Sequence, residues 1–244
     1  MERKIDRLNH LEFRNLIEGG IDTALLPVGT IEAHGITPLG TDVIIPEAMA
    51  ERIAPELNAL VCPAVPYGIT RGLVGHPGTI RIRPEIFKAY VRDILEALAG
   101  AGLKNLVVLN GHGGQTTELK DVLFETGRRA GARALLIEWW YDIDGIRQTE
   151  LEREGGHAGA DETACVMAID PSLVKPELFD EKQVAFYSRS YSAYPVPGSM
   201  IIYTEGDWSL NLDRSRCDSF FEAVSGRVTG TIKKVIAGWD ACGL

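Results

Sequence analysis

The chain has 244 residues, of which 45% are hydrophobic and 24% are charged, a composition typical of soluble globular proteins rather than disordered or membrane-spanning ones. Its formal net charge of -9 argues against non-specific binding of nucleic acid, which needs clustered Lys and Arg. No apolar run of membrane-spanning length and no leader pattern occur, and the four cysteines form no C-x-x-C pair. We therefore expect a cytoplasmic protein with reduced thiols, and neither nucleic acid nor membrane as a partner.

Four apolar runs of strand length occur in the sequence, at residues 24–28, 61–65, 106–109 and 134–137. Each run is apolar on both faces, which is typical of buried parallel strands. No repeat, linker or low-complexity tract divides the chain. Residues 1–244 are therefore expected to form a single domain.

Helical segments separate the predicted strands. Residues 46–57 and 84–99 each begin with a proline, which suits the first helical position, and further helices are predicted at 117–129, 160–168 and 219–237. The alternation of strands and helices predicts a layered α/β fold with a mostly parallel sheet. Residues 183–213 are rich in Tyr, Ser and Pro and are predicted to form a long loop or irregular hairpin, a candidate lid or oligomer contact.

Three potential metal ligands follow the first predicted strand. Glu32 and His34 are two residues apart, so in extended backbone their side chains point the same way. Gly35 and Gly40 allow the chain to turn back and bring Asp42 alongside them. Mixed imidazole and carboxylate donors are typical of Zn, Mn and Fe sites, whereas each residue alone could equally be a capping or hydrogen-bonding group.

Two later glycine-rich segments carry further candidates. His112 lies in a glycine-flanked turn after the third strand, and His157 precedes a helix whose first turn contains Glu162. Loops that follow parallel strands converge at the carboxyl edge of the sheet, so these side chains are expected to share one crevice. The alternatives are an incidental turn histidine at His112 and acidic residues that complement the helix dipole at Asp161 and Glu162.

Together the candidate ligands are three carboxylates and two imidazoles: Glu32, His34, Asp42, His112 and Glu162. Two divalent cations would bring four positive charges against three negative ones. A bridging hydroxide would balance the remaining charge, and metal coordination makes such a nucleophile available near neutral pH. The set therefore predicts a binuclear metal site suited to hydrolysis.

Four segments resemble the creatininase (creatinine amidohydrolase) family, in the family's order: GTIEAHGITPLGTDVIIPEAMA, PYGITRGLVGHPGTI, NLVVLNGHGG and GGHAGADET. They lie within residues 25–168, about two thirds of the chain. The resemblance implies a three-layer α/β/α fold with a mostly parallel central sheet. It also implies two divalent metal ions, Zn, Mn or Fe, and a homo-oligomer, commonly a hexamer.

The family's motifs fall on the same side chains: E-x-H-G on Glu32 and His34, Thr-Asp on Asp42, N-G-H-G-G on His112, and H-A-x-x-x-E on His157 and Glu162. The match implies that Asp42 bridges both ions, with Glu32 and His112 on one and His34 and Glu162 on the other. His157 resembles the family's non-ligand histidine. Its implied catalytic role is to protonate the leaving group or stabilise the tetrahedral intermediate, and a purely structural role is the alternative.

The sequence departs from the family in two places. The segment ITPLGTD is one residue shorter than usual and lacks a histidine, which leaves the substrate open. Gly114 stands where creatininase proper has a ligating glutamate, so Glu162 is expected to supply that carboxylate. Substrate contacts are predicted for Tyr67, His76, Trp139, Trp140 and Tyr141, although core packing or subunit contacts would explain the aromatic residues equally well.

The expected function is that of a metal-dependent hydrolase in which a metal-bound hydroxide attacks the carbonyl of a small substrate. The family resemblance implies that the bond is an amide, in a cyclic amide, a formamide or a peptide terminus. One alternative is a hydrolase that opens an inositol-derived diketo cyclitol at a carbon–carbon bond. Another is a non-catalytic metal-binding protein, but structural sites favour Cys and His over carboxylates.

Overall fold

The computed structural model describes residues 1–179 and 212–244. Its described part contains one sheet of parallel strands in the order β2-β1-β3-β4. The strands are β1 (Thr23–Val28), β2 (Ala59–Val61), β3 (Asn105–Asn110) and β4 (Arg133–Glu138). Val28 pairs with Asn110, and Asn110 pairs with Glu138, so β1, β3 and β4 end level with one another. The segments that follow these strands therefore leave from the same edge of the sheet.

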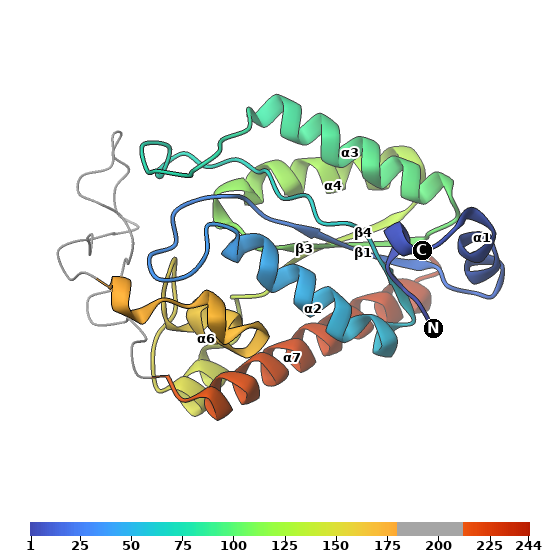
Figure 1. The fold of residues 1–244 in the computed structure, drawn as a ribbon. Helices are drawn as coiled ribbons and strands as arrows, with labels where there is room; N and C mark the ends of the chain where they lie inside the picture. Colours follow the sequence, from blue (N-terminus) through green and yellow to red (C-terminus); the bar gives the residue numbers. More distant parts are fainter. Residues whose placement is uncertain (180–211) are drawn as a thin grey trace.

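Helices cover both faces of the sheet (Figure 1). One face carries α3 (Pro84–Gly100) and α4 (Thr116–Ala130), and the other carries α2 (Thr41–Leu57), α6 (Ala160–Ile169) and α7 (Arg214–Ala241). The shorter elements are η1 (Ile5–Arg7), α1 (His10–Glu18), η2 (Gly113–Gln115), α5 (Asp144–Ile146), η3 (Arg147–Leu151), η4 (Pro171–Leu173) and η5 (Pro176–Leu178). This arrangement confirms the predicted three-layer α/β/α fold with a parallel sheet.

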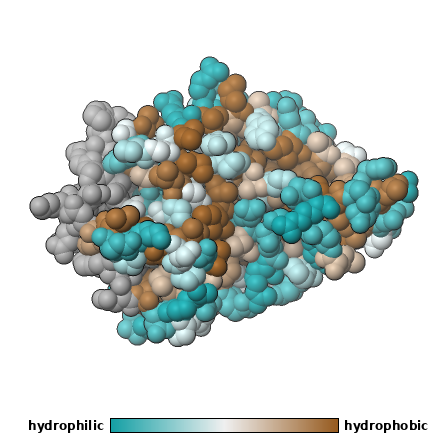
Figure 2. Space-filling model, in the orientation of Figure 1, coloured by the Kyte–Doolittle hydropathy of each residue, from teal (hydrophilic) through white to brown (hydrophobic). Residues whose placement is uncertain are grey.

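The sheet has a hydrophobic core on each of its two faces, because successive side chains along a strand point to opposite faces. Leu25 of β1 packs with residues of α2, α6 and α7, whereas its neighbour Leu26 packs with residues of α3 and α4. Figure 2 shows that hydrophobic side chains also gather near the middle of one outer face, with hydrophilic ones around them. Among the described helices, none is both long and apolar enough to cross a membrane.

The second strand differs from the prediction of 61–65. It is shorter and lies earlier, at Ala59–Val61, and Val65 makes only an isolated bridge to Val28. Pro63 and Pro66 explain the difference, because a proline has no N–H to donate to a strand ladder.

The predicted segment at 183–213 lies outside the described residues except for its last two.

Helix α2 begins at Thr41 rather than at Pro46, so Asp42 lies in its first turn instead of in a loop. Pro46 lacks the N–H that would bond to the carbonyl of Asp42 in a regular α-helix. That carbonyl packs against two glycines. An added Cβ at Gly29 would lie 2.2 Å from the Asp42 oxygen, and one at Gly111 would lie 1.9 Å from it. The two glycines therefore let the start of α2 approach the ends of β1 and β3.

Replacing Gly111 with alanine should destabilise the protein by about 1–3 kcal/mol or more, because the new methyl group overlaps the backbone of Asp42. Gly230 is the matched control, since it lies inside α7 with nothing within 4 Å of an added Cβ. Gly230→Ala should stabilise the protein by about 0.5–1 kcal/mol. Denaturant unfolding measures both changes, and an unchanged midpoint for Gly111→Ala would show that the close approach is wrong.

Candidate metal centre

The six side chains proposed from the sequence meet at the carboxyl edge of the sheet. Glu32 and His34 lie in the loop after β1, and Asp42 lies in the first turn of α2. His112 comes directly after β3. His157 and Glu162 belong to the loop before α6 and to its first turn. Glu32 and His34 are each 1% exposed, Asp42 and Glu162 are also buried, and His112 and His157 are partly buried.

Asp42 contacts two histidines from different segments. Its Oδ1 is 2.9 Å from Nε2 of His34, and its Oδ2 is 3.0 Å from Nδ1 of His112. Each carboxylate oxygen thus has its own imidazole. This is the geometry expected of a carboxylate shared between two adjacent sites.

Three overlapping groups could each hold a metal ion, with ligand atoms within 4.8 Å of one another: Glu32, Asp42 and His112; His34, Asp42 and Glu162; and Glu32, His34 and His157. In the first group, Oε1 of Glu32 is 3.1 Å from Nδ1 of His112. In the second, Oε2 of Glu162 is 3.7 Å from Nε2 of His34. These two candidate groups share Asp42, and the division of ligands between two metal ions stays a prediction.

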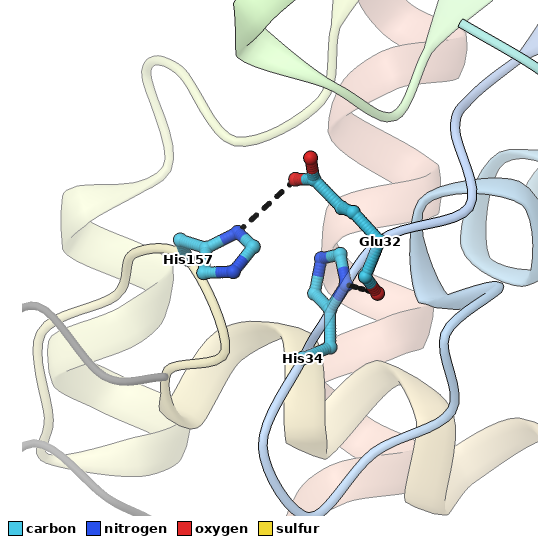
Figure 3. A group of neighbouring side chains, drawn as sticks. All are labelled: Glu32, His34 and His157. Carbon is cyan, nitrogen blue, oxygen red and sulfur yellow. Dashed lines mark hydrogen bonds and ion pairs between the residues drawn. The ribbon is translucent and has the colours of Figure 1, made fainter. Parts of the chain in front are cut away.

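The third group is drawn in Figure 3. Nδ1 of His157 is 3.5 Å from Oε1 of Glu32, and the His157 ring lies beside the His34 ring with centroids 4.2 Å apart. His157 therefore borders the first group through Glu32 and the second through His34. It can act on a molecule bound there without being one of their ligands.

Backbone carbonyls orient all three imidazoles. Nδ1 of His34 is 2.9 Å from the carbonyl oxygen of Glu32, and Nε2 of His112 is 3.0 Å from that of Ile69. Nε2 of His157 is 2.8 Å from the carbonyl oxygen of Ala33. A carbonyl only accepts hydrogen bonds, so each of these nitrogens carries the proton and donates it. The opposite nitrogen of each ring then faces carboxylate oxygens, as in histidines that bind metals.

The buried carboxylates lack enough hydrogen-bond donors. Within residues 1–179 and 212–244, both side-chain oxygens of Glu32 and Oδ2 of Asp42 are buried with no hydrogen-bond donor other than the imidazole nitrogens beside them. Buried charges are costly unless paired or bound to a metal. Nitrogen and oxygen donors of this kind are ligands for Zn, Mn and Fe. The residues present therefore fit divalent metal ions.

Protons are the cations that compete with metal in this cluster. Burial opposes charging of His34, but Asp42 and Glu162 outweigh it and raise the pKa of His34 to about 10. Burial is likewise outweighed at His112, where Glu32 and Asp42 raise the pKa well above its usual value. Burial, Asp42 and Asp161 raise the pKa of Glu162. In the metal-free protein His34 is consequently protonated at neutral pH, whereas His112 and Glu162 keep their protons to a higher pH than is usual for their side chains.

Metal uptake should therefore release protons. Any proton held by a ligand atom must leave before a metal can bind there, and the raised pKa values of His34, His112 and Glu162 increase the number of protons still bound. Apparent affinity should consequently rise with pH, by about tenfold per unit for each proton displaced. Calorimetric titration of the metal-free protein with Zn²⁺ in buffers of different ionisation enthalpy counts the protons. Release of none would contradict the proposed ligands.

Gln115 is a buried residue of this region that sequence reasoning missed. Its side-chain amide donates to the carbonyl of Gly29 at 3.4 Å and to Oδ1 of Asn110 at 3.0 Å, and it accepts from the N–H of Ile69 at 3.3 Å. Gln115 thus connects the segments that carry Glu32 and His112. The only signal in the sequence was its position directly after the N-G-H-G-G segment.

Gly114 leaves no room for a ligating side chain at its own position. An added Cβ at Gly114 would lie 2.4 Å from Nε2 of His112 and 3.1 Å from the carbonyl oxygen of Ile69. No side chain fits there while His112 keeps its hydrogen bond to Ile69. Glu162 instead lies beside His34 and Asp42, as expected from the sequence.

The residues predicted to contact the substrate differ in how exposed they are to solvent. Tyr67 is 48% exposed, and His76 is partly buried in the loop between β2 and α3. Trp140 lies next to the turn that carries His112, with its Cζ2 3.8 Å from an added Cβ at Gly113. Trp139 is 2% exposed in the core beneath α2, α6 and α7, which agrees with the packing alternative. Tyr141 is 54% exposed, and its role and those of Tyr67, His76 and Trp140 stay predictions.

The fold and the buried cluster define an α/β protein with candidate metal sites at the carboxyl edge of a parallel sheet. Residues 6–209 match the family described as creatininase, creatinine amidohydrolase. The chain therefore belongs to the creatininase family of hydrolases.

Three relatives differ in what their names say they act on. The chain is 28% identical to creatinine amidohydrolase of Pseudomonas putida over 79% of its own length and 81% of the relative's. It is 28% identical to 3-dehydro-scyllo-inosose hydrolase of Thermotoga maritima over 64% of this chain and 53% of that protein. It is 29% identical to the mycofactocin precursor peptide peptidase of Mycolicibacterium smegmatis over 63% and 60%, respectively. These similarities leave the substrate open.

Solved structures of creatininase share the fold. A crystal structure of creatinine amidohydrolase superimposes with a TM-score of 0.84 at 24% identity, covering 96% of this chain and 97% of that one. Structures described as creatininase with Mn, and as a mutant creatininase of Zn-Zn type, give TM-scores of 0.82 and 0.83 at 24% and 23% identity, with 96% of this chain and 98% of theirs covered. These likenesses confirm the three-layer architecture.

Proposed function

We propose that this protein is a metal-dependent hydrolase that binds two divalent cations and cleaves an amide in a small molecule, either a cyclic amide or a formamide. The observation that carries the proposal is the placement of Asp42, whose two carboxylate oxygens each face a different histidine. One ion would be held by Glu32, Asp42 and His112, and the other by His34, Asp42 and Glu162. The metals named for two creatininase structures support Mn or Zn as candidates, and Fe suits the same donors.

When bound, the two cations would make hydroxide available near neutral pH and polarise the substrate carbonyl. The protein's own groups would hold these ions, and four of the five proposed ligands, Glu32, His34, Asp42 and Glu162, are buried away from water. Glu32 lies between His157 and the candidate site that contains His112, since its Oε1 is near the imidazoles of both His112 and His157. Glu32 is therefore placed both to bind an ion and to orient His157.

His157 is proposed to transfer the proton. Its Nε2–H donates to the carbonyl of Ala33, so its Nδ1 faces Glu32 and the space beside the metal ligands. Burial and the neighbouring His34 lower the pKa of His157 to about 4. The imidazole is consequently neutral at physiological pH. Its Nδ1 can accept a proton as the carbonyl is attacked and return it to the departing amine.

Amide cleavage is favoured because the relative that acts on creatinine aligns with the largest share of the chain among these three. A second candidate is the opening of an inositol-derived diketo cyclitol at a carbon–carbon bond, which the similarity to 3-dehydro-scyllo-inosose hydrolase supports. Attack on a carbonyl begins both reactions. Similarity to a peptidase adds a peptide terminus as a third candidate substrate.

The test is an assay of the purified protein loaded with Zn²⁺ or Mn²⁺ against creatinine, aromatic formamides, short peptides and a diketo cyclitol. Appearance of a new amine and carboxylate supports the amidohydrolase. Turnover of the cyclitol alone would replace amide cleavage by carbon–carbon cleavage. Bound metal with no turnover of any of them would favour the non-catalytic alternative.

We also propose a homo-oligomer, a hexamer by analogy with the family. Light scattering tests this directly. A mass equal to one chain of 26.7 kDa would contradict it.

A further inference from the structure

The short loop that carries His157 is tied to the start of α6 on both sides of the histidine. The N–H of Gly156 donates to Oδ1 of Asp161 at 3.1 Å, and the N–H of Ala158 donates to Oε2 of Glu162 at 2.6 Å. Two carboxylates in the first turn of α6 therefore fix the peptide groups that flank His157.

The backbone of this loop is strained, so these hydrogen bonds are needed. Ala158 has φ of 53°, in the left-handed region that costs a residue with a Cβ about 1–2 kcal/mol. Gly156 has φ of 154°. Without its ties to Asp161 and Glu162, the loop would relax to other conformations and His157 would turn away from Glu32.

Asp161 is itself held by Arg147. Oδ2 of Asp161 accepts from Nε of Arg147 at 3.0 Å and from Nη2 at 2.7 Å, and Oδ1 also accepts from the N–H of Glu162 at 2.9 Å. Asp161 is only 1% exposed, and a buried carboxylate of this kind needs a paired cation. Gly155 lets the pair form, because an added Cβ there would lie 2.0 Å from Oδ2 of Asp161 and 2.5 Å from Nε of Arg147.

Arg147 also contacts the segment after β4. Its Nη2 donates to the carbonyl of Trp140 at 2.8 Å, and its Nη1 donates to Asp144 at 2.8 Å. Trp140 lies beside the turn that carries His112. Arg147, at the start of the π-helical η3, thus joins the loop of His157 to the segment after β4, which lies beside the turn of His112.

We propose that Arg147 and Asp161 are a positioning pair for His157, which extends the proposed function by naming the residues that set its proton-transfer group. Neither belongs to the metal-holding groups found among the described residues. Complementing the dipole of α6 would need only the negative charge of Asp161. It would not need the hydrogen bond to Gly156, the bidentate contact with Arg147 or the glycine at 155.

Arg147→Met tests the pair, because it keeps an apolar stem of similar length and removes the guanidinium. We expect kcat to fall by about 10- to 100-fold, as for other residues that orient an active-site histidine, with KM and the metal content little changed. Hydrogen–deuterium exchange of residues 155–159 should become faster. Arg147→Lys should recover part of the rate, because lysine restores the charge and one hydrogen bond.

Two further variants make the result interpretable. Asp161→Asn keeps an oxygen for Gly156 and Glu162 but cannot accept both hydrogen bonds from Arg147, so it should repeat the effect if Arg147→Met fails to fold. Arg216→Met is the matched control. Arg216 forms an ion pair at 2.7 Å with Glu152, which lies in the same segment between β4 and α6 as Arg147, but this pair is on the surface. It should leave both kcat and exchange unchanged.

An unchanged kcat and unchanged exchange in Arg147→Met and Asp161→Asn would overturn the proposal. Loss of bound metal in step with the rate would overturn it too, because the pair would then support Glu162 rather than His157. A wild type that turns over none of the substrates would defeat the proposed function instead. Exchange at residues 155–159 would still show whether the pair orders the loop.

Discussion

Asp42→Asn is expected to abolish the binding of both metal ions and to lower turnover by about 10³-fold or more, since the metals supply several kcal/mol of transition-state stabilisation. The substitution keeps the size of the side chain. It removes the negative charge and replaces one of the two oxygens that face His34 and His112 with an NH₂ group that cannot bind a cation. A single substitution should therefore empty two sites.

Elemental analysis of the purified variant measures this loss directly. Asp240→Asn is the matched control, because Asp240 makes an exposed ion pair with Arg133 at 2.7 Å, outside the metal cluster. The control should keep both metals and full activity. An Asp42→Asn protein that keeps one tightly bound ion would show that the two sites do not share this carboxylate.

His157→Ala is expected to lower kcat by about 10²–10⁴-fold while the protein keeps both metal ions, because proton transfer contributes a factor of this size. The structure gives the reason. Nδ1 of His157 faces Glu32 at 3.5 Å, and its Nε2–H is held by the carbonyl of Ala33. The His157 side chain thus points toward Glu32 and the candidate metal ligands, but it is not a ligand in either of the two groups that share Asp42.

Steady-state kinetics and metal analysis on the same preparation separate catalysis from binding. His10→Ala serves as the control, since His10 is an exposed residue at the start of α1. A normal rate for His157→Ala would eliminate the proton-transfer role. Loss of one metal would instead make His157 a ligand, through the group that it forms with Glu32 and His34.

The sheet and the meeting of the candidate ligands could be predicted because both depend on local pattern. Runs that are apolar on both faces located β1, β3 and β4 to within a residue or two at each end. Because loops that follow parallel strands lie at the same edge of the sheet, His112 could then be predicted to lie near Glu32. The start of α2 was predicted too late because a proline at the first helical position was the strongest local signal, whereas packing of Asp42 against Gly29 and Gly111 favours a longer helix.

The supporting residues could not be predicted, because their roles exist only in the folded chain. Gln115 donates a hydrogen bond to Gly29, which is 86 residues away in the sequence. Arg147 lies in a π-helical turn and donates a hydrogen bond to Asp161. Trp139, for which the sequence allowed either a substrate contact or core packing, lies in the core. Such contacts follow from tertiary packing, which hydrophobic periodicity does not encode.

Anomalous X-ray diffraction from crystals of the wild-type protein loaded with Zn²⁺, collected above the zinc absorption edge, tests the proposed binuclear centre most directly. We predict two peaks per chain. One should lie between Glu32, Asp42 and His112, and the other between His34, Asp42 and Glu162. Absence of any peak at these residues, or a single peak between Glu32, His34 and His157, would contradict the centre bridged by Asp42.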